Sequence, residues 1–138
     1  MSHNLYCFVC LFSFSVFQIR LRKWSVSYAG RVEVFLAGKW GVINSHNWQL
    51  ADAHVTCRRL GFSGADLAVR GATYVFNAKF SGNAMGIQWI DNVECLGNES
   101  YLHECPHEVF FVHVEVFEAG VVCKTENAGK SLRIKVSI

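Results

Sequence analysis

Six cysteines carry the most specific chemistry in this sequence, because cysteines can form disulfides with one another or bind metal together with histidine. Two of them, Cys7 and Cys10, lie in an apolar stretch near the N-terminus. The other four lie in the body of the chain, at Cys57, Cys95, Cys105 and Cys123. Four cysteines allow three pairings, and an even number suits a secreted domain that leaves no thiol free.

Zinc binding is the alternative use of the later cysteines. His103, Cys105 and His107 are close in sequence and could surround a metal together with Cys95. However, two cysteines separated by nine residues and followed by a histidine two residues later do not form a common zinc spacing. In a secreted chain, this spacing favours disulfides over zinc.

Residues 98–100 form an N-glycosylation sequon, with Asn98 as the acceptor. The sequon lies between Cys95 and Cys105, in a segment predicted to be an exposed loop. We therefore expect Asn98 to carry a glycan in a secreted protein.

Positive and negative charges are segregated along the chain, although the net charge is only +2. Residues 19–80 hold nine of the 13 Lys and Arg side chains, whereas residues 81–126 hold eight of the 11 acids. Arginine suits bidentate recognition of sulfate, phosphate or carboxylate groups, so a basic patch could bind polyanionic ligands. Pairing of the two halves into an ordinary solvated surface is the alternative reading. The candidate ligand contacts are Arg31, Lys39, Arg58, Arg59 and Arg70.

No motif in the sequence predicts catalysis or sequence-specific nucleic-acid binding. Residues 61–64, GFSG, lack the G-x-S-x-G pattern of a nucleophile elbow, and no phosphate-binding loop motif is present. No run of Lys and Arg is dense enough to indicate a nucleic-acid interface. We therefore expect a binding module that is not an enzyme.

One helix must position the first cysteine of the body. Leu50, Ala53, Cys57 and Leu60 share one face of a helix over residues 49–60, which would turn the Cys57 sulfur toward the core. Asn47 is the predicted N-terminal cap, and Gly61 is the predicted end of the helix.

Short strands surround this helix in the sequence. Residues 30–43 read as a β-hairpin, because apolar and polar residues alternate over 31–36, a tight turn follows at 37–38, and residues 39–43 can form the returning strand. Residues 61–86 read mainly as loops. The other expected elements are strands at 19–21, 73–76, 87–90 and 120–123 and a helical turn at 99–104. One helix among several short strands predicts an α+β fold.

The N-terminus reads as a targeting segment. Residues 5–17 form a 13-residue apolar run, which is short for a membrane span and suits the core of a signal peptide. Ser13 and Ser15 supply a small-x-small cleavage pattern, although no Lys or Arg precedes the run. We expect residues 1–18 to be a signal peptide and the protein to be extracellular. An uncleaved anchor and a mis-annotated or truncated start are the alternatives.

Four blocks of sequence resemble the scavenger receptor cysteine-rich (SRCR) domain family. They are GRVEVFLAGKWGVI at 30–43, NWQLADAHVTCRRLGF at 47–62, IQWIDNVECLGNESYLHECPH at 87–107 and EAGVVC at 118–123. The resemblance implies a curved antiparallel sheet that cradles one helix, and a domain over residues 19–124. It also implies the disulfides Cys57–Cys123 and Cys95–Cys105. Asn44 and His113 occupy the positions of a further cysteine pair of the family, so this chain would be a two-disulfide variant.

The family often builds a divalent-cation site from two adjacent aspartates and a glutamate. Here the aspartate positions hold Ser45 and His46, and Glu118 is the acid that remains. One carboxylate and a serine make a poor cage for Ca²⁺, so we expect no cofactor. Glu118 is the remaining candidate metal ligand at this site; Asp91 is a candidate for a different site, and its alternative role is to cap a turn.

The resemblance implies a module that binds polyanionic, microbial or protein ligands at the cell surface, in a scavenger-type receptor or a secreted defence protein. The alternative is an accessory domain of a larger secreted enzyme, such as a protease or a lysyl-oxidase-like protein. Residues 132–136, LRIKV, are similar to the start of the domain, IRLR. We therefore expect residues 125–138 to be a linker and the start of a second repeat.

Overall fold

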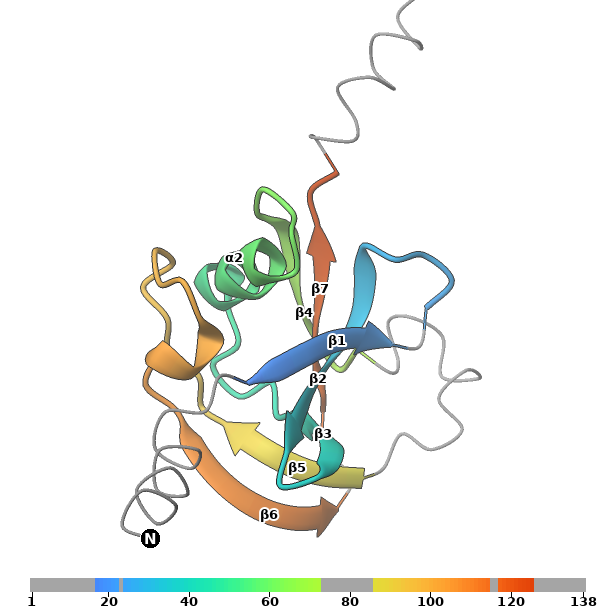
Figure 1. Ribbon diagram of the computed structural model, residues 1–138, viewed down its shortest axis with the longest axis vertical. Helices are drawn as coiled ribbons and strands as arrows, with labels where there is room; N and C mark the ends of the chain where they lie inside the picture. The colour runs from blue at the N-terminus through green and yellow to red at the C-terminus, as the bar shows by residue number, and fades with distance from the viewer. Residues whose placement is uncertain (1–16, 23, 73–85, 115–116, 126–138) are drawn as a thin grey trace, which may run out of the picture.

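The computed structural model describes residues 17–22, 24–72, 86–114 and 117–125. The predicted strand at 73–76 and the tail at 126–138 lie outside these residues. Figure 1 shows the elements, which in chain order are β1 (Gln18–Arg22), β2 (Ala29–Leu36), β3 (Lys39–Ile43), α2 (Leu50–Arg59), β4 (Ala65–Arg70), β5 (Gly86–Asp91), η2 (Leu102–Glu104), β6 (Glu108–Val114) and β7 (Ala119–Cys123).

The strands form one bent sheet in the order β4-β7-β2-β3-β5-β6, and β1 pairs with β2. β1 occupies one edge of β2. Both β7 and β3 pair along the other edge. The β3–β5 pairing is parallel, whereas the other pairings are antiparallel. The predicted α+β fold is confirmed, and the parallel pair makes the sheet mixed where a purely antiparallel one was expected.

Helix α2 packs against β4 and β7 through its buried face (Figure 1). Of the predicted apolar face, Ala53 and Cys57 are fully buried and Leu60 is half-buried; Val55, which was not predicted, is also fully buried. Leu50, the first residue of the helix and also part of that face, is 45% exposed. This one helix carries the cysteine that is bonded to the last strand.

The start of α2 differs from the prediction. Gln49 is the N-cap residue, and its backbone N–H donates to the Asp52 carboxylate at 2.7 Å. The predicted cap, Asn47, has a φ of 65° and donates its side-chain amide to Asn92 instead. Gly61, with a φ of 101°, ends the helix as predicted, since glycine adopts this left-handed conformation without steric cost.

Two strands were not predicted from the sequence. β4 lies within the segment that was read mainly as loops. Its sequence does not alternate as a strand's usually does, because a register shift between Ala65 and Leu67 leaves Asp66 and Leu67 adjacent and exposed. β6 pairs with β5 alone at one end of the sheet order. Both strands are defined by their partners more than by their own patterns.

The core lies between α2 and the sheet. Trp48 is its largest fully buried side chain, and its Nε1–H donates to the Gly120 carbonyl at 2.9 Å. Phe17, two residues before the predicted domain start at residue 19, also packs in this core. A Cβ at Gly41 would collide with the Trp89 ring, so glycine is required where this strand passes beneath the indole. In the described part of the chain, no helix is both long and apolar enough to cross a bilayer.

Candidate functional site: a disulfide-held loop and exposed basic side chains

Two disulfides hold the fold together. Cys57 of α2 is bonded to Cys123 of β7, 66 residues later, and this bond ties the helix to the sheet. Cys95 is bonded to Cys105, only ten residues later, and closes the loop that leads into η2. The structure therefore contains the pairing that the family resemblance implies.

A buried carboxylate joins the helix to the short disulfide loop. Asp52 is 1% exposed and accepts hydrogen bonds from the backbone N–H of Cys95 and of Gln49, both at 2.7 Å. Burial raises the pKa of Asp52, although these two hydrogen bonds oppose that rise. The sequence analysis missed this residue; the Gln49–Asp52 spacing of a capping box was the available signal.

Arg58 holds the other end of the same loop. Its guanidinium donates to the backbone carbonyls of Gly97 and Glu99 at 2.7 and 2.9 Å. These two carbonyls flank Asn98, which is exposed to solvent. The glycosylation candidate thus lies on an accessible loop whose backbone is fixed from both sides.

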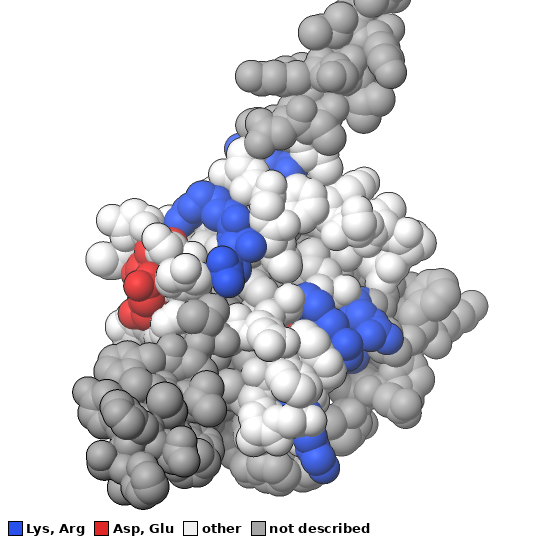
Figure 2. Space-filling view, in the orientation of Figure 1, with Lys and Arg blue, Asp and Glu red and all other residues white. Residues whose placement is uncertain are grey.

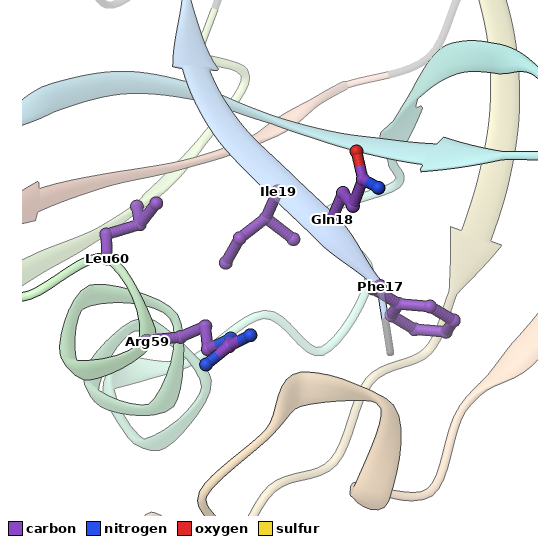
Figure 3. Close-up of a pocket in the computed structure, with 5 residues that line it drawn as sticks. All are labelled: Phe17, Gln18, Ile19, Arg59 and Leu60. Carbon is purple, nitrogen blue, oxygen red and sulfur yellow. The ribbon is translucent and has the colours of Figure 1, made fainter. Parts of the chain in front are cut away.

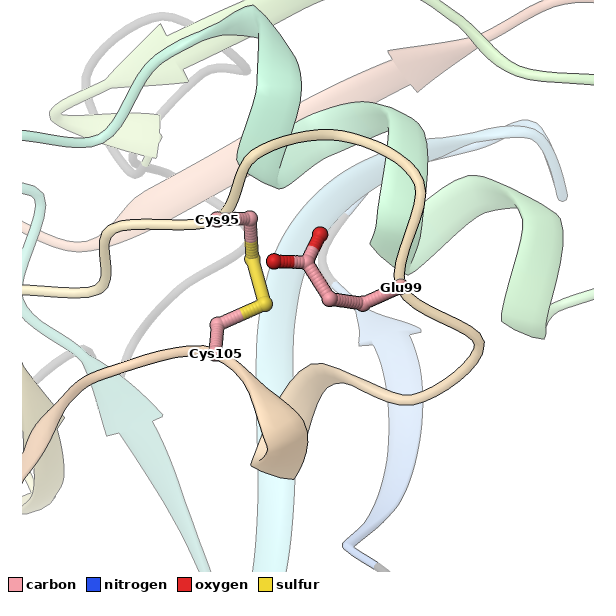
Figure 4. A group of neighbouring side chains, drawn as sticks. All are labelled: Cys95, Glu99 and Cys105. Carbon is pink, nitrogen blue, oxygen red and sulfur yellow. A yellow bond between two sulfur atoms is a disulfide. The ribbon is translucent and has the colours of Figure 1, made fainter.

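The carboxylate of Glu99 lies beside the Cys95–Cys105 disulfide, as Figure 4 shows. A thiolate is the form of cysteine that binds metal, and the disulfide consumes both thiols. Glu99 accepts hydrogen bonds from the backbone N–H of Leu96 and Gly97, both at 2.9 Å, and these bonds lower its pKa. This group of side chains is a loop brace, and it does not fit a zinc ion.

His103 lies in an aromatic cluster beneath the loop. Its ring contacts Phe17, with centroids 5.7 Å apart, and Tyr101, with centroids 5.3 Å apart. Its Nδ1 is buried and has no hydrogen-bond partner among the described residues. Burial lowers the pKa of His103, so the neutral imidazole is favoured in the folded protein.

The candidate ligand contacts do not form one patch. Lys39 is exposed at the start of β3, Arg58 and Arg59 end α2, and Arg70 is exposed at the end of β4. Arg31, in contrast, is 4% exposed and forms ion pairs with Glu33 and Glu118. Its burial removes Arg31 from the ligand contacts that a solvent-borne partner could reach.

A chain of ion pairs runs from the surface into the core. Arg20 of β1 donates to one Glu33 carboxylate oxygen at 2.8 Å, and Arg31 donates to the other. The Arg31 Nη1 group then lies 3.6 Å from Glu118. Arg20 also stacks over the Trp40 ring, 3.9 Å from its centroid. Sequence reasoning did not find this network, because its members lie on three strands or strand ends.

The predicted metal ligands lie in surroundings that do not fit a cation. Glu118 is 2% exposed and faces the Arg31 guanidinium. Asp91 accepts a hydrogen bond from the backbone N–H of Asn92, whose φ is 57°, as a turn-capping aspartate does. Ser45 and His46, at the family's aspartate positions, line a depression of about 360 Å³ together with the Arg70 guanidinium. Its lining residues are Asn44, Ser45, His46, Arg70 and Phe117. These residues do not fit Ca²⁺, since a carboxylate cage is replaced by a positive charge.

A second depression, of about 520 Å³, opens between the C-terminal end of α2 and the start of β1. Figure 3 shows Arg59 and Leu60 on one side and Phe17, Gln18 and Ile19 on the other. Arg59 lies over the Tyr101 ring, with 4.6 Å between the guanidinium carbon and the ring centroid. The depression therefore combines a held positive charge with apolar walls.

In Figure 2, Lys and Arg form separate groups on one face of the molecule, and Asp and Glu gather beside one of these groups. The acids Glu94, Glu99 and Glu104 lie in the segment between β5 and β6, next to the helix that carries Arg58 and Arg59. The charge segregation seen along the sequence is thus only partly kept in space.

The scavenger receptor cysteine-rich domain family matches residues 23–125. Galectin-3-binding protein of Rattus norvegicus is 37% identical over 80% of this chain, and Lysyl oxidase homolog 3B of Danio rerio is 40% identical over 70% of it. These matches cover 18% and 11% of the two relatives, so the chain spans less than a fifth of their length.

Solved structures agree with this family match. The third SRCR domain of murine neurotrypsin superposes with a TM-score of 0.62 at 38% identity, covering 78% of this chain and 95% of that domain. The SRCR domain of mouse MARCO, in its dimeric form, gives a TM-score of 0.59 at 33% identity, over 75% of this chain and 94% of that one. With one disulfide that joins its helix to its mixed sheet and a second that closes the loop before η2, this chain belongs to the scavenger receptor cysteine-rich domain family.

Proposed function

We propose that this chain is an extracellular, non-catalytic module that binds polyanionic or protein ligands through exposed basic side chains. One observation carries the proposal. Lys39, Arg59 and Arg70 are exposed, and no described carboxylate forms an ion pair with any of them. Arg58 is also exposed, but its guanidinium holds the Gly97 and Glu99 carbonyls. The positive charge of the first three residues is therefore available to an anionic partner, whereas the charge of Arg31 is neutralised inside the fold.

The separation of these side chains supports a weak and extended contact. A long polyanion can reach several positive groups at once, whereas a compact ligand would meet one of them. Arg59 adds a shaped contact, because it lies over an aromatic ring beside the depression that Figure 3 shows. Repetition of such modules in a longer chain would strengthen binding, since later contacts become intramolecular.

The extracellular assignment rests on the two disulfides, which persist in oxidising compartments. We propose that the segment 1–18 contains a signal peptide that is cut after Ser15. Phe17 would then stay in the mature chain, where it packs in the core. We also propose that Asn98 carries a glycan and that residues 125–138 lead into a further domain. Mass spectrometry of secreted, non-reduced protein would test cleavage, pairing and glycosylation together.

Binding to heparin and to alginate tests the polyanion proposal. We expect salt-dependent binding of the wild-type protein, because exposed charge pairs are screened as ionic strength rises. The Lys39→Gln/Arg59→Gln variant should bind more weakly, whereas the matched Lys39→Arg/Arg59→Lys variant keeps both charges and should bind as the wild type does. Binding that ignored both salt and charge would overturn the proposal.

A second candidate function is that of an accessory domain in a larger secreted enzyme. The specific observation is the 40% identity to Lysyl oxidase homolog 3B and the 38% identity to Lysyl oxidase homolog 4 of Bos taurus. The sequence of the full-length transcript separates the two functions. A catalytic domain beyond residue 138 would support the accessory role, and further SRCR repeats would support the receptor role.

A further inference from the structure

The depression around Arg70 is built from three separate parts of the chain. Asn44, Ser45 and His46 come from the segment between β3 and α2, Arg70 ends β4, and Phe117 precedes β7. Its volume of about 360 Å³ lies within the range of small-molecule sites, which starts at roughly 300 Å³.

Backbone hydrogen bonds fix the walls of this depression. The Ser45 N–H donates to the Phe117 carbonyl at 2.8 Å, which joins two of the three parts. The Trp48 N–H donates to the Ser45 carbonyl at 3.0 Å, and the Arg70 Nε–H donates to the Trp48 carbonyl at 3.1 Å. The guanidinium is therefore oriented before any ligand arrives, which reduces the entropy lost on binding.

The donors in this depression suit an anion. Nε of Arg70 is held by Trp48, and no described residue accepts a hydrogen bond from its two Nη groups. These groups can donate side by side to one carboxylate. Among the described residues the lining contains no carboxylate, and the adjacent Glu118 is buried against Arg31. The position where the family often holds a cation thus presents a positive charge.

Phe117 gives the depression a flat apolar wall. Its side chain is 62% exposed, which is unusual for a large aromatic residue. Sugar rings present apolar C–H faces that pack on aromatic rings, while hydroxyl groups bond to short polar side chains such as those of Asn44 and Ser45. An aromatic wall beside an oriented guanidinium matches a ring that carries a carboxylate.

We propose that the depression around Arg70 binds one acidic sugar residue, with the sugar carboxylate on the Arg70 guanidinium and the ring against Phe117. The proposal rests on the polyanion-binding function above and names the part of an acidic polysaccharide that the module recognises. Ser45 and His46, which stand where the family resemblance places aspartates, add no negative charge to this lining.

The test is an NMR titration of the intact chain with three probes: glucuronate, glucose and acetate. Glucose lacks the carboxylate, and acetate lacks the ring. We expect glucuronate to shift the Arg70 Nε–Hε signal and the backbone amides of Ser45, His46 and Phe117, and to bind more tightly than either other probe. Equal binding of acetate would overturn the role of the ring, and equal binding of glucose would overturn the role of the charge.

Variants assign the binding to these side chains. Arg70→Gln should weaken glucuronate binding about tenfold, as expected for the loss of a charge-assisted pair. Arg70→Lys keeps the charge but loses the bidentate geometry, so its affinity for glucuronate should lie between those of the wild type and of Arg70→Gln. Phe117→Ala should lower the affinity for glucuronate to about the affinity for acetate. The matched control, Arg22→Gln, removes an exposed positive charge from β1 and should leave binding unchanged. The amide spectrum of each variant reports whether it is folded.

The outcomes separate this inference from the broader function. If the wild-type protein binds alginate but glucuronate leaves the Arg70 signals unmoved, the sugar site is overturned and the polyanion function stands. If glucuronate binds at Arg70 but neither alginate nor heparin binds, the polyanion function is overturned. Unchanged glucuronate binding by a folded Arg70→Gln protein would also overturn the site.

Discussion

The Nη1 group of Arg31 lies 3.6 Å from the carboxylate of Glu118, inside the fold, where both side chains are less than a tenth exposed. Glu118 is the acid that the sequence offered as a metal ligand, and Arg31 is a base that the sequence offered as a ligand contact. The pair engages both groups within the protein, so each is a structural residue here. Of the candidate ligand contacts, Lys39, Arg58, Arg59 and Arg70 remain exposed.

Glu118→Gln should destabilise the protein. The substitution leaves Arg31 with Glu33 as its remaining ion-pair partner among the described residues. We expect the free energy of unfolding to fall by about 1–3 kcal/mol, the usual cost of an under-satisfied buried polar group. Urea unfolding monitored by tryptophan fluorescence measures this change. A variant as stable as the wild type would show that the pair contributes nothing to the fold.

Calcium should not stabilise the wild-type protein. A ligand that binds only the folded state raises the melting temperature, and the residues around Glu118 and Arg70 do not fit a divalent cation. We expect equal melting temperatures in millimolar calcium and in chelator, measured by calorimetry. A rise with calcium would contradict the assignment of this depression to anions.

The two disulfides should differ in their contributions to stability. Chain-entropy estimates give about 4 kcal/mol for the Cys57–Cys123 bond, which closes a separation of 66 residues, and about 3 kcal/mol for the Cys95–Cys105 bond, which closes ten. Double alanine variants of each pair, compared by urea unfolding, measure both values. The reverse order would show that local strain or packing outweighs loop closure.

Stability should fall in mildly acidic solution because of His103. Burial holds its pKa below the ordinary value of 6.5, so the unfolded chain binds the proton more readily than the folded one does. The stability that neutral His103 provides is therefore present above the unfolded pKa and is lost as the pH falls below about 6.5. His103→Phe keeps the ring packing against Phe17 and removes the titration.

Melting temperatures of the wild type and of His103→Phe between pH 5 and 7.5 test this expectation. The wild type should lose more stability at the acidic end than the variant does. His107→Phe serves as the matched control, since His107 also contacts the Phe17 ring. Parallel pH profiles for the wild type and His103→Phe would contradict the assignment.

Arg58→Ala should loosen the loop that carries Asn98. Its guanidinium donates to the carbonyls of Gly97 and Glu99, and these two bonds would be lost. We expect amide hydrogen exchange over residues 96–100 to increase about fivefold, the equivalent of about 1 kcal/mol of local stability. Arg59→Ala is the matched control, because Arg59 contacts the Tyr101 ring and not the loop carbonyls. Equal exchange in both variants would remove Arg58 from this role.

Local patterns in the sequence predicted the elements that such patterns can specify. The alternation over residues 31–36 and the turn at 37–38 predicted the β2–β3 hairpin, and the spacing of Ala53 and Cys57 predicted the buried face of α2. The positive φ of Gly61 followed from its place after the last helical turn. These features depend on a residue and its neighbours within one or two turns, so they can be read without a tertiary structure.

Contacts between distant segments were decided only by the tertiary structure. Arg31 alternates as a surface residue would, yet it is buried because two carboxylates from other positions surround it. The Arg70 depression joins three segments, and no local period reports which side chains will meet across a bent sheet. The sequence by itself determined the family, the helix and the hairpin; the packing of non-adjacent strands determined which charges are neutralised in the core and which are left for ligands.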